Sequence, residues 1–232
     1  MEKLNLPDTF QDTIRNTDLS DISKDLVESS IDSFLSDGIL KEIPIVKSIL
    51  GIIKVSSNIS EYLFLKKIIS FLNEIKEIDP KKRKEEIDKI DSSERYRIKV
   101  GEKLLYILDR SDDYEKAEYI AKLFVALLEE KISYDDFIRG SNAINTLSIP
   151  DFRLFLSYNE YKDTVWYERN REIIYIEDAS LFVAVGLMFF DTEDIIVDDS
   201  NQHGNPFNVK GGKLEPIFSS LGNKVRAIFK VI

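Results

Sequence analysis

Few residues in this chain are suited to catalysis or to metal binding. It contains no cysteine and a single histidine, His203, within the segment Asn201-Gln202-His203-Gly204-Asn205-Pro206. Thiolate chemistry is therefore excluded, and a Ser/His pair or a histidine metal site would have to include His203. The nearby Asp198 and Asp199 do not complete a recurring ligand spacing, and the segment has the composition of a loop. We interpret His203 as a solvent-exposed loop residue and predict no metal site.

Carboxylates are concentrated between Asp191 and Asp199. The alternating oxygen ligands and central glycine of a calcium-binding EF-hand loop are missing there, and Ile195-Ile196-Val197 interrupts the acids. We prefer to interpret the segment as an acidic hairpin whose charges protect a strand edge from aggregation. Gly211-Gly212 indicates a tight turn, because no Lys-Ser or Lys-Thr follows it to form a phosphate loop. The sequence thus predicts no catalytic residue and no cofactor, and we expect a non-enzymatic protein.

The charge balance bears on the partners and the location of the protein. Thirty-two basic residues stand against 42 acidic residues, which gives a formal net charge of −10. Such a charge keeps a protein soluble and repels a phosphate backbone from most of its surface, so a nucleic-acid partner is disfavoured. The segment Met1-Glu2-Lys3-Leu4-Asn5-Leu6-Pro7-Asp8 has no basic region leading into an apolar stretch, and the lack of cysteine suits an intracellular protein. We expect a cytoplasmic location.

Most of the chain before residue 149 has helical periodicity. Residues 1–18 combine Pro7 with many polar residues and predict an irregular N-terminal arm. Residues 19–148 predict a bundle of helices joined by short loops, with helical segments at 19–38, from Asp79-Pro80 onward, and at 91–108, 112–131 and 133–144. Asp112 with Glu115 and Ser133 with Asp136 predict capping boxes at the starts of the last two. We interpret the tract Lys81-Lys82-Arg83-Lys84-Glu85-Glu86 as a solvated helix face.

After Ile149-Pro150 the pattern changes to a mixture of helices and β-prone segments. Helices are predicted at 151–158 and 177–187, strands at 188–190, 195–197 and 207–209, and a last strand passes into a terminal helix. The predicted fold class is therefore mainly α, with an N-terminal helical bundle followed by a small α+β domain at 149–232.

The order of these C-terminal elements resembles the closing half of a winged-helix domain. Gly186-Leu187-Met188 stands where such domains often have a Gly-Leu-Ile step before the wing, and Phe218-Ser219-Ser220-Leu221-Gly222 stands where they have a Leu-Thr-x-x-Gly step after it. The resemblance implies a winged-helix-like unit. DNA binding by this unit is disfavoured, because the candidate recognition helix begins with Glu177-Asp178 and continues with apolar residues.

Two apolar strings in the N-terminal part resemble helical proteins of the Abi-alpha type, which belong to bacterial phage defence. They are Ile43-Pro44-Ile45-Val46, followed by Gly51, and Ala121-Lys122-Leu123-Phe124-Val125-Ala126-Leu127-Leu128. The resemblance implies an abortive-infection protein or a defence accessory protein. It brings no catalytic residues with it.

Residues 43–72 form the sharpest candidate for a functional segment. Ile45, Ile49, Ile52 and Ile53 belong to a helix that is apolar around most of its circumference, which is typical of burial in a bundle or of contact with a membrane surface. The segment has no charge-free stretch of about 20 residues, the length that spanning a bilayer requires. We favour central burial, and the membrane surface stays open as a partner.

Three functional hypotheses follow. The first is a non-enzymatic regulatory or adaptor protein, an accessory component of phage defence, that acts through contacts with a protein partner or with further copies of itself. Its predicted contact residues are Trp166, Tyr167 and Phe207. The second is a membrane-active abortive-infection effector that uses residues 43–72 and has a peripheral membrane location. The third is a winged-helix DNA-binding regulator.

Overall fold

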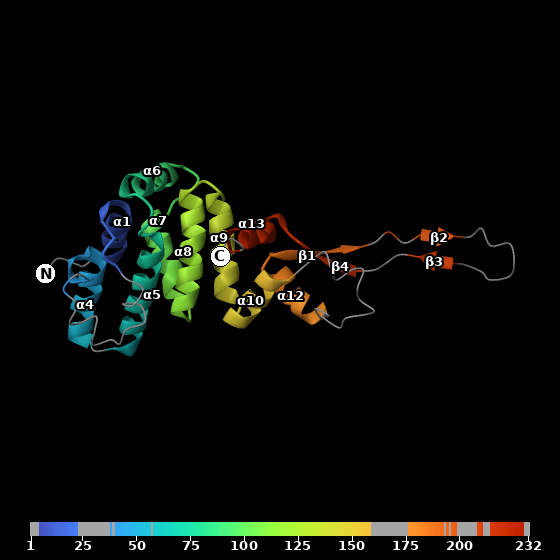
Figure 1. Ribbon diagram of the computed structural model, residues 1–232, viewed down its shortest axis with the longest axis horizontal. Coiled ribbons are helices and arrows are strands. Elements are labelled where there is room, and N and C mark those ends of the chain that lie inside the picture. Colours follow the sequence, from blue (N-terminus) through green and yellow to red (C-terminus); the bar gives the residue numbers. More distant parts are fainter. Residues whose placement is uncertain are drawn as a thin grey trace. The chain divides into compact units, whose positions relative to one another are not determined.

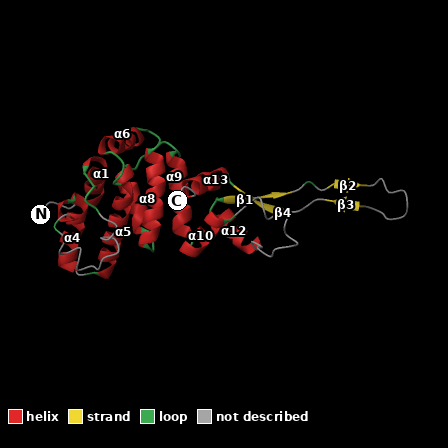
Figure 2. Ribbon diagram, in the orientation of Figure 1, coloured by secondary structure: helices red, strands yellow, loops and turns green. Residues whose placement is uncertain are grey.

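The chain divides into two compact units, residues 1–149 and residues 150–232. The first unit is helical, and the second combines helices with short strands (Figure 2). The predicted fold class, a mainly α protein with a helical bundle followed by a small α+β domain, is confirmed. The computed structural model describes residues 5–22, 38, 40–56, 58–158, 176–192, 194, 196–198, 208–210 and 214–229.

The first unit is built around two long helices, α5 and α8, which lie side by side (Figure 1). A chain of aromatic rings crosses its core, with centroid distances of 5.9 Å for Phe10 and Phe71, 5.6 Å for Phe71 and Phe124, and 5.5 Å for Phe124 and Phe137. The described elements are α1 (Leu6–Asn16), the 3-10 helix η1 (Leu40–Glu42), α4 (Pro44–Ser56), α5 (Ile59–Ile75), α6 (Pro80–Asp91), α7 (Val100–Asp109), α8 (Tyr114–Leu128) and α9 (Tyr134–Thr146).

Several helix starts lie where the capping residues predict them. Asp79 caps α6, with its carboxylate accepting from the backbone N–H of Lys81 at 2.7 Å, and Pro80 takes the first helical position. Ser133 and Asp136 form the predicted capping box at the start of α9. The α8 cap is Asp113 and not the predicted Asp112.

One expectation for this unit needs correction, and a second falls largely outside the described residues. The predicted helix at 91–108 is interrupted, because α6 ends at Asp91 and α7 begins only at Val100. The segment expected to be a helix from Leu19 begins as a turn through Ile22, and almost all of the remainder lies outside the described residues.

The prediction of an irregular N-terminal arm at residues 1–18 is wrong. Residues Leu6–Asn16 form α1, which contacts α4, α6 and α7. Phe10 and Ile14 are fully buried one helical turn apart, and Pro7 lies in the first turn, where its missing N–H costs no hydrogen bond. Since α1 is only 11 residues long, packing of its apolar face must stabilise it more than helix propensity does.

A buried arginine holds the end of α1 in place. Arg83 of α6 is fully buried, and its guanidinium donates to the carbonyl oxygens of Ile14 at 3.1 Å and Thr17 at 2.6 Å. Those carbonyls belong to the last turn of α1 and the residue after it, where unpaired acceptors and the negative end of the helix dipole favour a cation. Burial lowers the pKa of Arg83, and the charges of Asp18 and Asp79 oppose that effect. The tract Lys81-Lys82-Arg83-Lys84 is therefore solvated at its lysines but not at its arginine.

We predict that Arg83→Ala destabilises the first unit by about 3 kcal/mol, because it leaves two carbonyls without their donor inside the fold. Urea unfolding followed by circular dichroism measures this loss. Lys82→Ala, at an exposed neighbouring position, is the control and should change the unfolding free energy by less than about 0.5 kcal/mol. Equal effects of the two substitutions would contradict the assigned role of Arg83.

The second unit contains three described helices and four described strands. They are α10 (Ile149–Ser157), α12 (Ile176–Ala184), β1 (Met188–Thr192), β2 (Ile196–Asp198), β3 (Asn208–Lys210), β4 (Leu214–Phe218) and α13 (Ser220–Phe229). The strands predicted at 188–190, 195–197 and 207–209 are confirmed to within one or two residues. The core contains packed aromatic rings. The ring centroid of Phe155 lies 5.4 Å from that of Phe182 and 5.6 Å from that of Phe218.

The four described strands form two antiparallel pairs, which we together call the hairpin. β1 is antiparallel to β4, with Met188 opposite Phe218, and β2 is antiparallel to β3, with Ile196 opposite Lys210. Ile196 lies eight residues after Met188, and Lys210 lies eight residues before Phe218. Both strand pairs therefore share one register. Figure 1 shows β2 and β3 in line with β1 and β4.

One serine cap, that of Ser219, joins the hairpin to the helices that flank it. The Ser219 hydroxyl donates to the carbonyl of Gly186 at 2.7 Å and accepts from the backbone N–H of Gly222 at 3.0 Å, which caps α13. Gly186 has a φ of 77°, a backbone conformation that favours glycine. The two steps singled out in the sequence, at 186–188 and 218–222, therefore meet at the base of the hairpin.

Candidate functional site

The predicted contact residues Trp166, Tyr167 and Phe207 lie outside the described residues, and so does His203. The structure thus gives no position for the expected contact surface. Among the described residues, no group of three or more His, Asp or Glu side chains is arranged to hold a metal ion.

The apolar segment at 43–72 supplies part of the core of the first unit. Ile45, Ile49 and Ile53 are at most 2% exposed, whereas Ile52 is half-buried. No described helix combines the length and the apolar character that crossing a bilayer requires. The exposed apolar residues of the segment gather where α4 ends and α5 begins, at Val55, Ile59 and Leu63.

We predict that Ile53→Ala destabilises the protein by about 3 kcal/mol, since it removes buried methyl groups and leaves a cavity. Ile59→Ala removes the same atoms at a position that is 73% exposed, and it should change stability by less than about 0.5 kcal/mol. Thermal and urea unfolding of the two variants gives both values. A cost at position 59 as large as that at position 53 would contradict the burial pattern.

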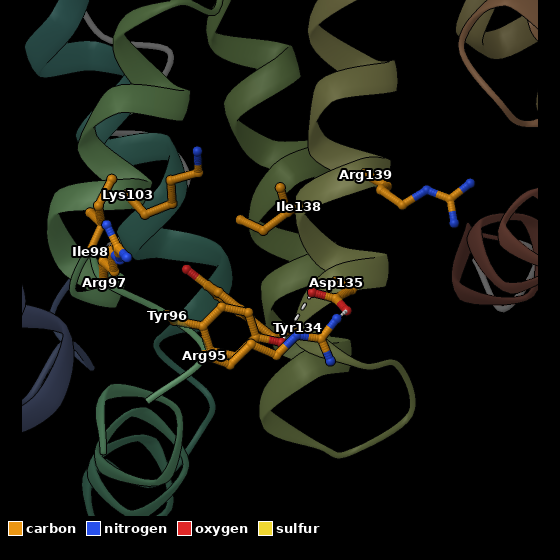
Figure 3. Close-up of a pocket in the computed structure, with 9 residues that line it drawn as sticks. All are labelled: Arg95, Tyr96, Arg97, Ile98, Lys103, Tyr134, Asp135, Ile138 and Arg139. Carbon is orange, nitrogen blue, oxygen red and sulfur yellow. Dashed lines mark hydrogen bonds and ion pairs between the residues drawn. The ribbon is translucent and has the colours of Figure 1, made fainter. Parts of the chain in front are cut away.

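The described residues form a groove between the α6–α7 loop and α9 (Figure 3). Its volume is about 520 Å³, within the size range of ligand-binding clefts. One wall comes from the loop and the start of α7, and the other comes from the first two turns of α9. The lining residues are Arg95, Tyr96, Arg97, Ile98, Lys103, Tyr134, Asp135, Ile138 and Arg139.

The groove is rich in positive charge. Arg95, Arg97, Lys103 and Arg139 stand against one lining carboxylate, that of Asp135. Arg95 forms an ion pair with Asp135, so one cation is partly compensated. Arg97 and Arg139 are exposed and form no ion pair with any described residue. The groove therefore has an excess of cations in a chain whose net charge is −10.

Two tyrosines form the floor of the groove. The rings of Tyr96 and Tyr134 pack edge to face with centroids 4.6 Å apart, and Tyr134 stacks on Phe137 of the core. The Tyr96 hydroxyl donates to Asp135 at 3.1 Å (Figure 3). This bond and the Arg95 ion pair place the Asp135 carboxylate between the loop and α9, so it joins the two walls.

The ends of the α6–α7 loop are fixed by Asp91 and Gln11. One Asp91 carboxylate oxygen accepts from the backbone N–H of Val100 at 2.9 Å, and the other accepts from the Gln11 carboxamide at 2.5 Å. The Gln11 carbonyl oxygen accepts in turn from the backbone N–H of Gly101. Helix α1 thereby determines where the loop that carries Arg95, Tyr96 and Arg97 begins and ends.

Burial in the floor affects the ionisation of both tyrosines. Burial, with added effects of the Asp91 charge and of Tyr96, raises the pKa of Tyr134 to about 12. Burial and the hydrogen bond to Asp135 also raise the pKa of Tyr96, while Arg95 opposes this. Both phenols are therefore neutral at physiological pH.

We predict that Tyr134 makes stability depend on pH in the alkaline range. The unfolded chain ionises this phenol near pH 10, whereas the folded chain retains the proton up to a pKa of about 12. The contribution to stability is thus complete below pH 10 and is lost as the pH rises from 10 to 12. Urea unfolding at four pH values from 9 to 12 should show a smaller decline for Tyr134→Phe than for the wild type.

Tyr106→Phe, which removes a hydroxyl from a tyrosine that is 55% exposed, is the control for this titration. The same decline in wild type and in Tyr134→Phe would show that the phenolate of Tyr134 is not disfavoured by folding.

The sequence did not predict the groove, because its lining residues come from two segments about 40 positions apart. The local signal was the polar and basic run Ser92-Ser93-Glu94-Arg95-Tyr96-Arg97, which has too few apolar residues to continue the helix predicted at 91–108. Nothing in the sequence pairs this run with Asp135 and Arg139.

Its lining side chains suit the binding of an anion. Arginine guanidinium groups bind carboxylate or phosphate through charge-assisted, often paired hydrogen bonds. Ile98 and Ile138 add an apolar contact beside these donors.

In comparisons with protein-family models, with curated proteins and with solved structures, nothing matches this chain.

Proposed function

We propose that this chain is a non-enzymatic regulatory or adaptor protein whose groove binds an acidic segment of a protein partner. The observation that carries the proposal is the excess of cations around the groove, with Arg97 and Arg139 unpaired among the described residues. An acidic segment would supply the carboxylates that these two guanidinium groups lack.

The charge of the remaining chain favours a short acidic segment over nucleic acid. A nucleic acid extends beyond any single groove, and a net charge of −10 repels its phosphates from most of the surface. A short peptide segment contacts the cations of the groove and little else. It also presents side chains that can pack on Ile98 and Ile138.

The openness of the groove favours a protein segment over a small metabolite. Arg95, Arg97, Ile98 and Arg139 are all exposed, so a ligand bound among them stays accessible to solvent along its length. Small-molecule sites, in contrast, bury most of the ligand surface. Figure 3 shows Arg139 pointing away from the other lining residues.

We predict that a fluorescein-labelled ten-residue peptide of alternating Asp and Ser binds the protein, and that Arg97→Glu/Arg139→Glu weakens its Kd at least about tenfold, the equivalent of about 1.4 kcal/mol. Fluorescence anisotropy measures both Kd values. Affinity should also fall as the salt concentration rises, because the contacts are exposed to solvent.

The matched control is Lys81→Glu/Lys82→Glu, which changes the net charge by the same amount on exposed residues outside the groove. It should alter the Kd less than about twofold. A peptide of alternating Asn and Ser should not bind. If the wild type fails to bind the acidic peptide, or if both charge-reversal variants weaken binding equally, the proposal is wrong.

The role in phage defence and the winged-helix-like character of the second unit stay predictions that rest on the resemblances in the sequence. The same holds for the cytoplasmic location. The groove is compatible with an accessory protein in such a system, since an adaptor needs a surface that recognises a partner and does not need catalytic groups.

A further inference from the structure

The hairpin of the second unit has an excess of negative charge, whereas the groove has an excess of positive charge. Between Met188 and Phe218, six carboxylates stand against two lysines, Lys210 and Lys213; the acids are Asp191, Glu193, Asp194, Asp198, Asp199 and Glu215. We call the four strands of this hairpin, β1 to β4, the arm. Its first strand and the residues after it contain acids and no cation up to Asp199.

Two acids of the arm, Asp191 and Asp194, are not neutralised by any described residue. Asp191 and Asp194 are exposed, and neither forms an ion pair with a described residue. The β1–β4 register places Asp191 directly opposite Glu215. Like charges at directly opposed positions destabilise a strand pair, so a cation supplied from outside would stabilise the arm.

The geometry of the arm also leaves it in need of a contact. An isolated two-stranded hairpin is marginally stable in water. Among the described elements, β2 and β3 pack extensively only on each other, and Figure 1 shows them beyond the helix α12 of their own unit. Among the described elements, no third strand pairs with β2 or β3, so each keeps an outer edge that a second protein surface can cover.

We infer that the arm of one copy of this chain docks in the groove of a second copy. The inference rests on the proposed function, an acidic segment in the groove, and names that segment. Arg97 and Arg139 of one copy would meet the exposed carboxylates of the other copy, which include Asp191 and Asp194. Such a contact joins two different surfaces, so repeated contacts form closed rings or open chains.

The experiment compares four proteins by light scattering coupled to gel filtration, from about 5 to about 500 μM protein. The wild type should increase in mean mass with concentration, starting from the monomer value of 26.8 kDa. The groove variant Arg97→Glu/Arg139→Glu and the arm variant Asp191→Lys/Asp194→Lys should each associate at least about tenfold more weakly, because like charges then face each other. Lys81→Glu/Lys82→Glu should behave as the wild type.

Mixing the two variants in equal amounts gives the decisive measurement. The mixture contains an intact groove on one protein and an intact arm on the other, and its reversed surfaces also attract each other. Association should therefore return in the mixture, although each variant alone stays monomeric. Circular dichroism spectra and unfolding curves like those of the wild type ensure that both variants are folded.

Two outcomes would overturn the inference. One is a wild type that stays monomeric throughout the concentration range, and the other is a mixture that associates no better than its separate components. If the Asp/Ser peptide still binds the wild-type groove in either case, the acidic partner is another protein, and the proposed function stands without self-association.

Discussion

The packing of α1 against α6 and α7 is the constraint on which the groove depends. Gln11 connects the Asp91 carboxylate to the backbone of Gly101, and Asp91 connects the two ends of the loop that carries Arg95, Tyr96 and Arg97. The approach is close: a Cβ atom at Gly101 would lie 2.7 Å from the Gln11 Cα. Only glycine allows the helices to come so near each other without displacement of Gln11. One wall of the groove is thus held by a helix that contributes no residue to its lining.

The sequence predicted well those features that depend on local interactions. The Ser133/Asp136 capping box and the Asp79-Pro80 start belong to this class, since each hydrogen bond joins residues two or three positions apart. The strand positions in the second unit were also predicted, because short runs of β-branched and aromatic residues are separated there by turn-forming residues. Burial of Ile45 and Ile53 followed from an apolar helix without a span long enough for a bilayer.

The features that sequence analysis missed depend on contacts between distant segments. Helix α1 has two large buried residues on its face, Phe10 and Ile14, which is too few for a periodic signal. Arg83 resembles its lysine neighbours in sequence, and only the carbonyls of Ile14 and Thr17, more than 60 positions away, distinguish it. The groove has the same origin. Its cations are ordinary surface residues until the fold brings the loop and α9 together.

Net charge and local charge act over different distances, and this difference reconciles an acidic chain with a cationic groove. In α6, Lys84 and Lys89 lie beside acids of the same helix, as in the Lys84 and Asp88 pair at 2.9 Å, so their field is cancelled locally. Arg97 and Arg139 form no ion pair with a described residue, and their field persists over the Debye length of about 8 Å at physiological salt. Beyond that distance the net charge of −10 repels other acidic molecules. An anion is therefore attracted only where it fits the groove, which makes the acidic surface a source of selectivity.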